Sequence, residues 1–155
     1  MTDGVFPDRR YLEDFKVGDG FSYGAWEMTK EQMIAYAEIY DPEPFHLDEL
    51  AAIDLGWGGL IASGPQIVGL FRRLSKDAFP NSETVISPGW DEIRWLRPVF
   101  AGDILTCHSE IVEIRLLKSR PGEGLMKFFT EMKRQNGDVV STVLANWFIR
   151  CRPQD

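Results

Sequence analysis

Residues 65–78 read Pro-Gln-Ile-Val-Gly-Leu-Phe-Arg-Arg-Leu-Ser-Lys-Asp-Ala, and this stretch decides the fold. Its apolar residues recur at i, i+3, i+4 and i+7, at positions Ile67, Leu70, Phe71 and Leu74. That spacing places them in one stripe of an α-helix. Pro65 suits the first helical position, with Ser63 or Gly64 as the N-cap. The sequence therefore predicts one long amphipathic helix that must bury its stripe against another layer.

The chain before this helix predicts one strand and two shorter helices. A strand is expected near residues 21–28, and the capping box Thr29-Lys30-Glu31-Gln32 starts a helix over residues 30–40. This helix must end before Pro42, because a proline pushes the residue before it out of the α region. A short helix over residues 47–54 and a glycine-rich approach then lead into the long helix.

The chain after the long helix changes to the alternating pattern of strands. Turn signals separate four expected strands, at residues 85–95, 104–118, 125–135 and 139–150. Asn136-Gly137 joins the last two, and this dipeptide is a strong hairpin signal. Both faces of the last strand are largely apolar, which is typical of a strand covered on two sides.

One strand, then helices, then an antiparallel meander of about four strands defines an α+β fold. A single buried helix packed against a long curved antiparallel sheet is the most economical arrangement. Such a sheet leaves an edge or an outer face uncovered, so we expect a homodimer or a higher homo-oligomer.

Composition and charge narrow the class of protein. The 155 residues fit one domain over residues 1–155, with a core over about 15–150, and the 44% hydrophobic and 26% charged content is that of a globular protein. A net charge of −7 argues against nucleic-acid binding. No stretch approaches the roughly 20 apolar residues of a membrane span, and the N-terminus has no apolar signal region. Cys107 and Cys151 have no CxxC partners, which indicates a reducing, cytoplasmic setting.

The segment Asp41-Pro42-Glu43-Pro44-Phe45-His46 is the first candidate for chemistry. Its two prolines stiffen the backbone, so it can hold a carboxylate and an imidazole at a set separation if it curls. One interpretation is a general acid–base pair, because an imidazole titrates near neutral pH. The other is structural, with Asp41 capping backbone amides and His46 capping the next helix.

The segment Gly58-Gly59-Leu60-Ile61-Ala62-Ser63-Gly64-Pro65 is the second candidate. It enters the long helix, whose first N–H groups are free and whose dipole favours negative charge. A thioester oxygen that becomes enolate-like during water addition would be stabilised there. Ordinary helix capping is the alternative interpretation.

Other kinds of site are excluded by the residues present. Ser63 is not in a GxSxG elbow, since Ile61 and Pro65 stand where glycines are needed. No GxGxxG, GxxxxGK[ST] or HExxH motif occurs. His46 and His108 are the only histidines, so we expect no multi-histidine metal site, and His108 is interpreted as structural.

Three segments in order resemble the MaoC-like dehydratase and (R)-specific enoyl-CoA hydratase family. Asp41, Pro44 and His46 match its hydratase motif, and Gly59 to Gly64 matches its glycine-rich helix start. Residues 94–103, Arg-Trp-Leu-Arg-Pro-Val-Phe-Ala-Gly-Asp, match its Arg-rich strand end followed by Pro-Val and Gly-Asp. The likeness extends over about residues 15–150.

This resemblance implies a hot-dog fold, in which the sheet wraps the central helix and two protomers share a continuous sheet. It implies an acyl-CoA or acyl-carrier thioester substrate and a hydro-lyase activity, with coenzyme A only as part of the substrate and no other cofactor. Asp41 and His46 would activate the water, and the Gly64 N–H with Ser63 beside it would hold the thioester oxygen. Many members carry Asn where this chain has Glu43; that Asn helps order the loop, so the loop's hydrogen bonding and the substrate preference are where this chain is expected to depart from the family.

Two rival functions stay open from the sequence. A hot-dog thioesterase usually carries a carboxylate on or near the central helix, where this chain has Gln66 and no acid before Asp77. A non-catalytic acyl-thioester binding module is the second rival. The acyl tunnel is expected to be lined from among Trp57, Phe71, Trp90 and Trp95. Candidates for contacts with coenzyme A phosphates are Arg72, Arg94, Arg97, Lys118 and Arg120, and solvated surface charge is the alternative interpretation for each of them.

Overall fold

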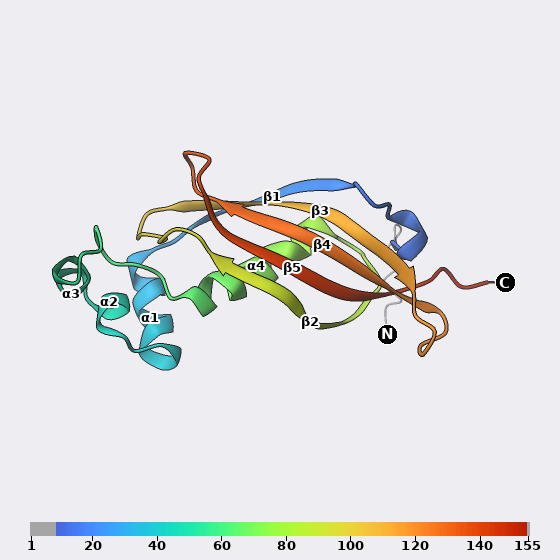
Figure 1. The fold of residues 1–155 in the computed structure, drawn as a ribbon, viewed down its shortest axis with the longest axis horizontal. Coiled ribbons are helices and arrows are strands. Elements are labelled where there is room, and N and C mark those ends of the chain that lie inside the picture. The colour runs from blue at the N-terminus through green and yellow to red at the C-terminus, as the bar shows by residue number, and fades with distance from the viewer. Residues whose placement is uncertain (1–8, 155) are drawn as a thin grey trace, which may run out of the picture.

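A five-stranded antiparallel sheet in the order β1-β3-β4-β5-β2 forms the larger part of the molecule (Figure 1). The structure is a computed structural model that describes residues 9–154; residues 1–8 and 155 of the predicted domain lie outside the described residues. The strands are β1 (Gly20–Glu27), β2 (Thr84–Trp95), β3 (Ile104–Leu116), β4 (Glu123–Lys133) and β5 (Val139–Arg150). The strand predictions are therefore confirmed to within a few residues at each end.

Helix α4 (Gly64–Ala78) lies against the inner face of this sheet, as predicted (Figure 1). Its apolar stripe is buried, and the layer beneath it is aromatic. The rings of Phe79 and Phe128 have centroids 5.0 Å apart, and Phe128 meets Trp147 at 5.0 Å, edge to face. Aromatic pairs at such separations add to the free energy gained by burial. The predicted α+β fold with one central helix is confirmed.

The predicted four-strand meander is wrong in one respect. Only β3, β4 and β5 follow one another in the sheet, while β2 pairs with β5 at the far edge and β1 pairs with β3. Phe79, which ends α4, packs against Phe21 of β1 with ring centroids 5.0 Å apart, yet the strand that follows the helix adds to β5 at the opposite edge of the sheet. Alternating hydrophobicity identifies a strand but not its partner, which is why the sequence did not distinguish the two orders.

A lobe of three short helices lies between β1 and α4 and extends beyond the end of the sheet (Figure 1). Its helices are α1 (Lys30–Tyr40), α2 (Pro44–Leu47) and α3 (Glu49–Asp54); one 3₁₀ turn, η1 (Leu12–Asp14), precedes β1. Thr29 caps α1 by accepting from the Gln32 N–H at 3.3 Å, which is one half of the predicted capping box.

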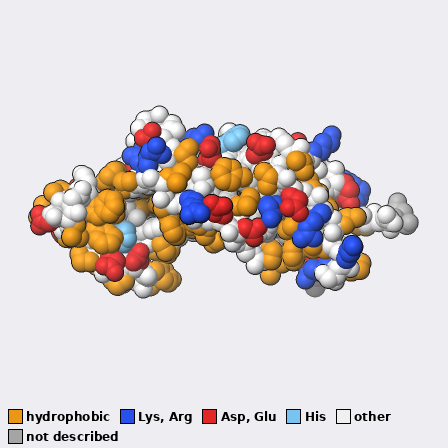
Figure 2. Space-filling model, in the orientation of Figure 1, with side chains coloured by type: hydrophobic (Ala, Val, Ile, Leu, Met, Phe, Trp, Pro, Cys, Tyr) orange, Lys and Arg blue, Asp and Glu red, His pale blue; other side chains and the backbone are white. Residues whose placement is uncertain are grey.

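The predicted helix over residues 47–54 is present as α3, which starts two residues later, and the one-turn helix α2 precedes it. Asp48 separates the two helices with an extended backbone, and its carboxylate accepts from the Ala51 N–H at 2.8 Å to start α3. As a result His46 lies in the single turn of α2 rather than in an open loop. Hydrophobic side chains gather on the surface of this lobe (Figure 2), and its exposed apolar residues are Ile39, Tyr40, Leu50, Ile53 and Leu55.

Strand β2 is an edge of the sheet, and among the described residues its only strand partner is β5. Its pairing is irregular around Pro88 and Gly89, where the register shifts. Large apolar side chains on or next to it are exposed, namely Ile86, Trp90, Trp95 and Leu96. Within residues 9–154, none of the helices is long and apolar enough to cross a membrane.

Candidate active site

Asp41 and His46 meet where the lobe approaches the start of α4. Asp41 is the C-cap of α1, and its backbone N–H still donates to the Ala37 carbonyl at 3.0 Å. Pro44 then starts α2, which brings His46 back toward Asp41. The His46 Nε2 atom lies 3.4 Å from Asp41 Oδ2, with side chains 9% and 29% exposed. The two prolines therefore produce the curl that the sequence required, and the predicted pair is brought together.

The ring of His46 is oriented by the backbone of the chain entering α4. Its Nδ1 atom lies 2.8 Å from the carbonyl oxygen of Ile61. A carbonyl can only accept, so Nδ1 carries a hydrogen, and in the neutral ring Nε2 is then an acceptor. Nε2 faces the Asp41 carboxylate, and 3.4 Å is longer than an ordinary N–H···O bond. Two acceptors that face one another in this way can share the two hydrogens of one water molecule.

Ser63 is fully buried, and its hydroxyl donates to Asp41 Oδ2 at 2.6 Å. The sequence placed Ser63 beside the thioester oxygen, whereas the structure directs its hydroxyl to the catalytic candidate Asp41. A hydrogen bond to an ionised carboxylate is strong, and it fixes the rotamer of the acid. The three side chains thus form one chain of contacts from Ser63 through Asp41 to His46.

Tyr36 on α1 is a further neighbour of this group. Burial raises the pKa of the Tyr36 hydroxyl, and the negative charge of Asp41 raises it further. Its phenol therefore stays protonated near the pair.

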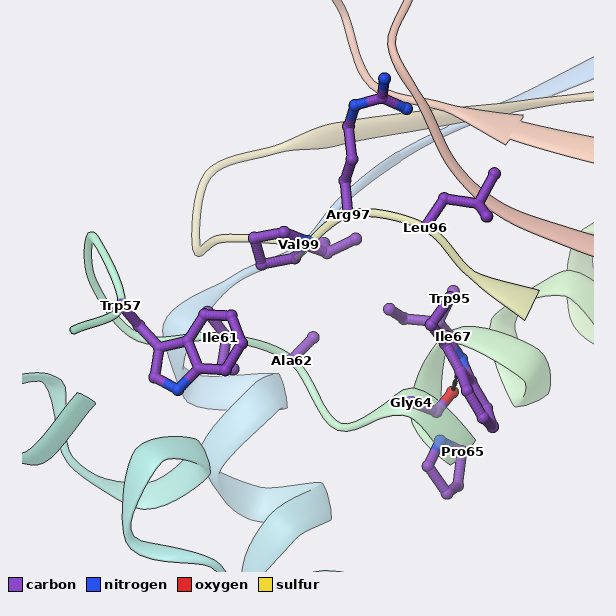
Figure 3. A pocket seen from close by; sticks show the side chains of 11 residues that line it. Trp57, Ile61, Ala62, Gly64, Pro65, Ile67, Trp95, Leu96, Arg97 and Val99 are labelled. Carbon is purple, nitrogen blue, oxygen red and sulfur yellow. Dashed lines mark hydrogen bonds between the residues drawn. The ribbon is translucent and has the colours of Figure 1, made fainter. Parts of the chain in front are cut away.

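Gly64 begins α4, and its backbone N–H donates to no described residue. Such a free N–H at the start of a 15-residue helix carries the positive end of the helix dipole. On the other side, the indole Nε1–H of Trp95 donates to the Gly64 carbonyl at 3.0 Å (Figure 3). The Trp95 ring is so close that a Cβ at position 64 would lie 2.7 Å from its Cε2 atom.

A cavity of about 480 Å³ lies between the α4 entrance and the segment that follows β2 (Figure 3). Its wall is mostly apolar and is formed by Trp57, Ile61, Ala62, Gly64, Pro65, Ile67, Trp95, Leu96, Arg97, Pro98 and Val99. Asp41 and His46 are not among these residues. They contact Ser63 and the Ile61 carbonyl, so the pair and the cavity share the segment 61–64.

Only some of the residues predicted to line the acyl tunnel or to bind phosphate lie at the cavity. Trp57 and Trp95 line the cavity, whereas Phe71 is fully buried and Trp90 packs against it with ring centroids 6.2 Å apart. Of the basic candidates, Arg97 alone lines the cavity, and its guanidinium donates to the Val139 carbonyl at 2.7 Å.

The other basic candidates are not among the residues that line the cavity. Three of them are engaged elsewhere: Arg72 over the Trp147 ring, Arg94 with Glu92 and Arg120 with Glu123. Lys118 is not among the cavity residues.

Three further predictions concern His108, metal binding and Glu43. His108 contacts Ser22 Oγ through Nδ1 at 2.8 Å across the β1–β3 pair, as expected of a structural histidine. Among the described residues, no three histidine, cysteine or acidic side chains cluster in a way that could hold a metal. Glu43 precedes α2, and its backbone carbonyl accepts from the His46 N–H at 2.9 Å. This contact is made by the main chain, so it does not depend on the side chain at position 43.

The sequence missed two groups that shape the site, the Ile61 carbonyl and the Trp95 indole. A backbone carbonyl has no sequence signature, and the residue type of Trp95 predicts only an acyl-tunnel lining. The close spacing of Trp95 to Arg97 and Pro98 in the matched motif was the available signal.

Comparison with known proteins assigns the fold and the family. The antiparallel sheet wrapped on one helix is a hot-dog fold, shared with the MaoC-like dehydratase from Rhodospirillum rubrum at a TM-score of 0.86 and 32% identity over 94% of this chain and 99% of that one. A family model for the MaoC like domain matches residues 16–127, and the chain belongs to this family.

Two more distant structures share the fold. The (R)-hydratase from A. caviae involved in PHA biosynthesis has a TM-score of 0.71 and 22% identity, covering 90% of this chain and 99% of that one. The truncated HadBC (3R-hydroxyacyl-ACP dehydratase) complex from Mycobacterium tuberculosis has a TM-score of 0.72 and 21% identity, covering 85% and 96%.

Proposed function

We propose that this protein is a hydro-lyase that adds water to a trans-2-enoyl thioester, or removes it from the 3-hydroxyacyl thioester. The observation that carries the proposal is the contact chain Ser63–Asp41–His46 beside the free N–H of Gly64. The family's hydratases and dehydratases support the reaction class.

Water activation is assigned to Asp41 and His46. One water donates its two hydrogens to the Asp41 carboxylate and to Nε2 of His46, which leaves a lone pair on its oxygen for the β carbon. As the C–O bond forms, the pair takes one proton from the water, and a proton from the same pair reaches the α carbon on the same face. Dehydration is the reverse of this path.

Stabilisation of the negative charge on the thioester oxygen is assigned to the start of α4. As water adds, the conjugated carbonyl becomes enolate-like, and the N–H of Gly64 donates to it. A preorganised donor of this kind is worth about 10²–10³ in rate. Because the helix dipole favours the same negative charge, the two effects act together.

The substrate is proposed to be an acyl-coenzyme A, with the cavity of Figure 3 next to the thioester. Arg97 at that cavity would meet a coenzyme A phosphate. We expect Arg97→Gln to raise KM for a coenzyme A ester by about tenfold, the value of one charge-assisted contact. KM for the N-acetylcysteamine thioester, which lacks phosphates, should not change, and an equal rise for both esters would contradict this role.

A homodimer through β2 is part of the proposal. β2 leaves one edge without a strand partner among the described residues and exposes apolar side chains there. Such edges are normally covered in soluble proteins. Light scattering should give twice the mass of one chain, and Ile86→Lys should shift the mass toward the monomer.

A thioesterase is the second candidate, and the site favours it less. Gln66 near the start of α4 donates to the Gln32 carbonyl at 3.2 Å, and Asp77 lies near the far end of α4, where it pairs with Arg73. The described part of α4 therefore brings no carboxylate to the cavity. Release of free thiol from acyl-coenzyme A, followed with a thiol reagent, would reveal this activity.

The decisive experiment compares turnover of crotonyl-coenzyme A by Asp41→Asn, His46→Gln and the parent protein. Each variant should lose about 10²–10⁴ in kcat, the range of general acid–base catalysis. The readout is the loss of the conjugated-thioester absorbance. His108→Gln is the matched control, since His108 lies on the β1–β3 pair, and it should retain activity. Parent-like turnover by either site variant would overturn the assignment.

A further inference from the structure

Gly64 is held in place by the side chain of Trp95. Two independent observations show the contact: the indole N–H donates to the Gly64 carbonyl at 3.0 Å, and the ring lies so near that a Cβ on residue 64 would come within 2.7 Å of it. No positive φ is recorded for Gly64. Glycine is therefore needed here for close approach, not for a left-handed backbone.

Gly64 needs such an external contact to keep its orientation. Glycine has the widest conformational freedom of any residue. The proline that follows it also biases residue 64 away from the helical region in which it stands. A hydrogen bond to one side of the residue and an aromatic ring packed against its Cα together restrict both backbone angles.

We infer that Trp95 is a positioning residue for the thioester oxygen. It does not touch the reacting atoms; it acts through Gly64, by fixing the direction of the Gly64 N–H. Trp95 is 51% exposed and lines the cavity next to Gly64, so it also forms one wall of the space for the thioester. This inference rests on the proposed function, because it assumes that the Gly64 N–H binds the thioester carbonyl.

The role predicts a particular pattern of kinetics. Trp95→Phe keeps a ring against Gly64 but removes the donor to its carbonyl. Because the oxyanion contact is made mainly in the transition state, kcat should fall about tenfold or more while KM changes less than about threefold. The pH dependence of kcat should be unchanged, since no titrating group is altered.

A spectroscopic test separates this inference from catalysis. The probe is 2,4-hexadienoyl-coenzyme A, titrated into Asp41→Asn protein, which should bind but not turn over. Polarisation of the thioester carbonyl by a hydrogen bond shifts the dienoyl absorbance to longer wavelength. We expect a red shift with Trp95 present and a loss of most of that shift in the Asp41→Asn, Trp95→Phe double variant at saturating probe. Trp90→Phe is the matched control, because Trp90 lies on the same strand and packs against Phe71, and it should keep the red shift.

The outcomes are distinguishable. An unchanged red shift in the Trp95→Phe background would overturn the positioning role and leave the proposed hydratase site intact. If the Asp41→Asn protein, which keeps Trp95, showed no red shift at saturation, the assignment of the Gly64 N–H to the thioester oxygen would be overturned, and the role of Trp95 with it.

The contact itself has a test that needs no activity. Gly64→Ala should lower the melting temperature when Trp95 is present, because the new Cβ meets the ring. In a Trp95→Ala background the same substitution should cost much less. Equal losses in both backgrounds would show that the ring does not restrict residue 64.

Discussion

The Asp41 carboxylate is the most connected group of the site, since both Ser63 and His46 contact its Oδ2 atom. Ser63 donates at 2.6 Å from a fully buried position, so water cannot replace it easily. The hydroxyl thus does for Asp41 what the Ile61 carbonyl does for His46: each fixes one member of the pair from outside.

Replacement of Ser63 by Ala tests this role. Loss of the donor frees the carboxylate to rotate, so kcat should fall about tenfold to a hundredfold. Ser63→Thr keeps the hydroxyl and should restore the parent kcat. A Ser63→Ala kcat equal to that of the parent would contradict the assignment.

At the residue scale, the sequence predicted which side chains lie together better than it predicted their contacts. Asp41 and His46 followed from the stiff segment and from the family resemblance, and the structure brings them together. The partner of the Ser63 hydroxyl depends on where the lobe lies relative to α4, which residue types do not reveal. The structure directs the Ser63 hydroxyl to Asp41, and the assignment of Ser63 to the thioester oxygen stays a prediction.

Among the elements, α4 was predicted most fully, because an apolar stripe at helical spacing identifies both the element and its buried face. At one position of that helix, nothing in the described residues explains why the residue is glycine. Gly69 is exposed in the helix interior, and a Cβ added there would meet nothing within 4 Å.

Gly69→Ala should therefore stabilise the protein by about 1 kcal/mol, the difference in helix propensity. Urea unfolding should show a higher midpoint, and the melting temperature should rise by roughly 2–4 °C. Gly124→Ala is the contrasting variant, because its Cβ would overlap the Leu12 side chain and lie 2.9 Å from the Arg115 carbonyl, and it should destabilise. A destabilised Gly69→Ala protein would mean that another surface packs on this face of α4 in solution.

The order of the strands in the sheet could not be predicted from the sequence. The alternating pattern located β2 and β5, but the pairing of Trp95 with Ser141 joins residues far apart in the chain. Local alternation carries no information about such a pairing, so the position of β2 next to β5 is known only from the structure.

For the molecule as a whole, buried polar side chains where β1, β3 and β4 meet make the free energy of unfolding depend on pH. Burial raises the pKa of the Cys107 thiol to about 12, and burial also raises the pKa of the Tyr23 phenol. Tyr23 donates to or accepts from Ser109 at 2.7 Å, and Ser109 is 2.6 Å from Thr130, so these groups lie where β1, β3 and β4 meet.

Alkaline pH should unfold the protein through these groups. The folded state favours the neutral thiol, so its contribution to stability is fully present below about pH 8.5, where the unfolded thiol titrates, and is lost as the pH rises toward 12. Urea midpoints should be level from pH 7 to 8 and decline above pH 9. Cys107→Val keeps the packing without the thiol, and its midpoint should decline less steeply. Parallel declines would assign the effect to other groups.

The attachment of β2 to β5 has a consequence for the nascent chain. Asp41, His46, Ser63 and Gly64 have all left the ribosome long before the last strand is made. Trp95 is held in its strand by Ser141 and its neighbours on β5, so its contact with Gly64 can form only after β5 has been synthesised. The acid and the base are therefore made early, and the start of α4 is fixed in place last. A chain stalled before Val139 carries every reacting group but cannot yet present them to a thioester.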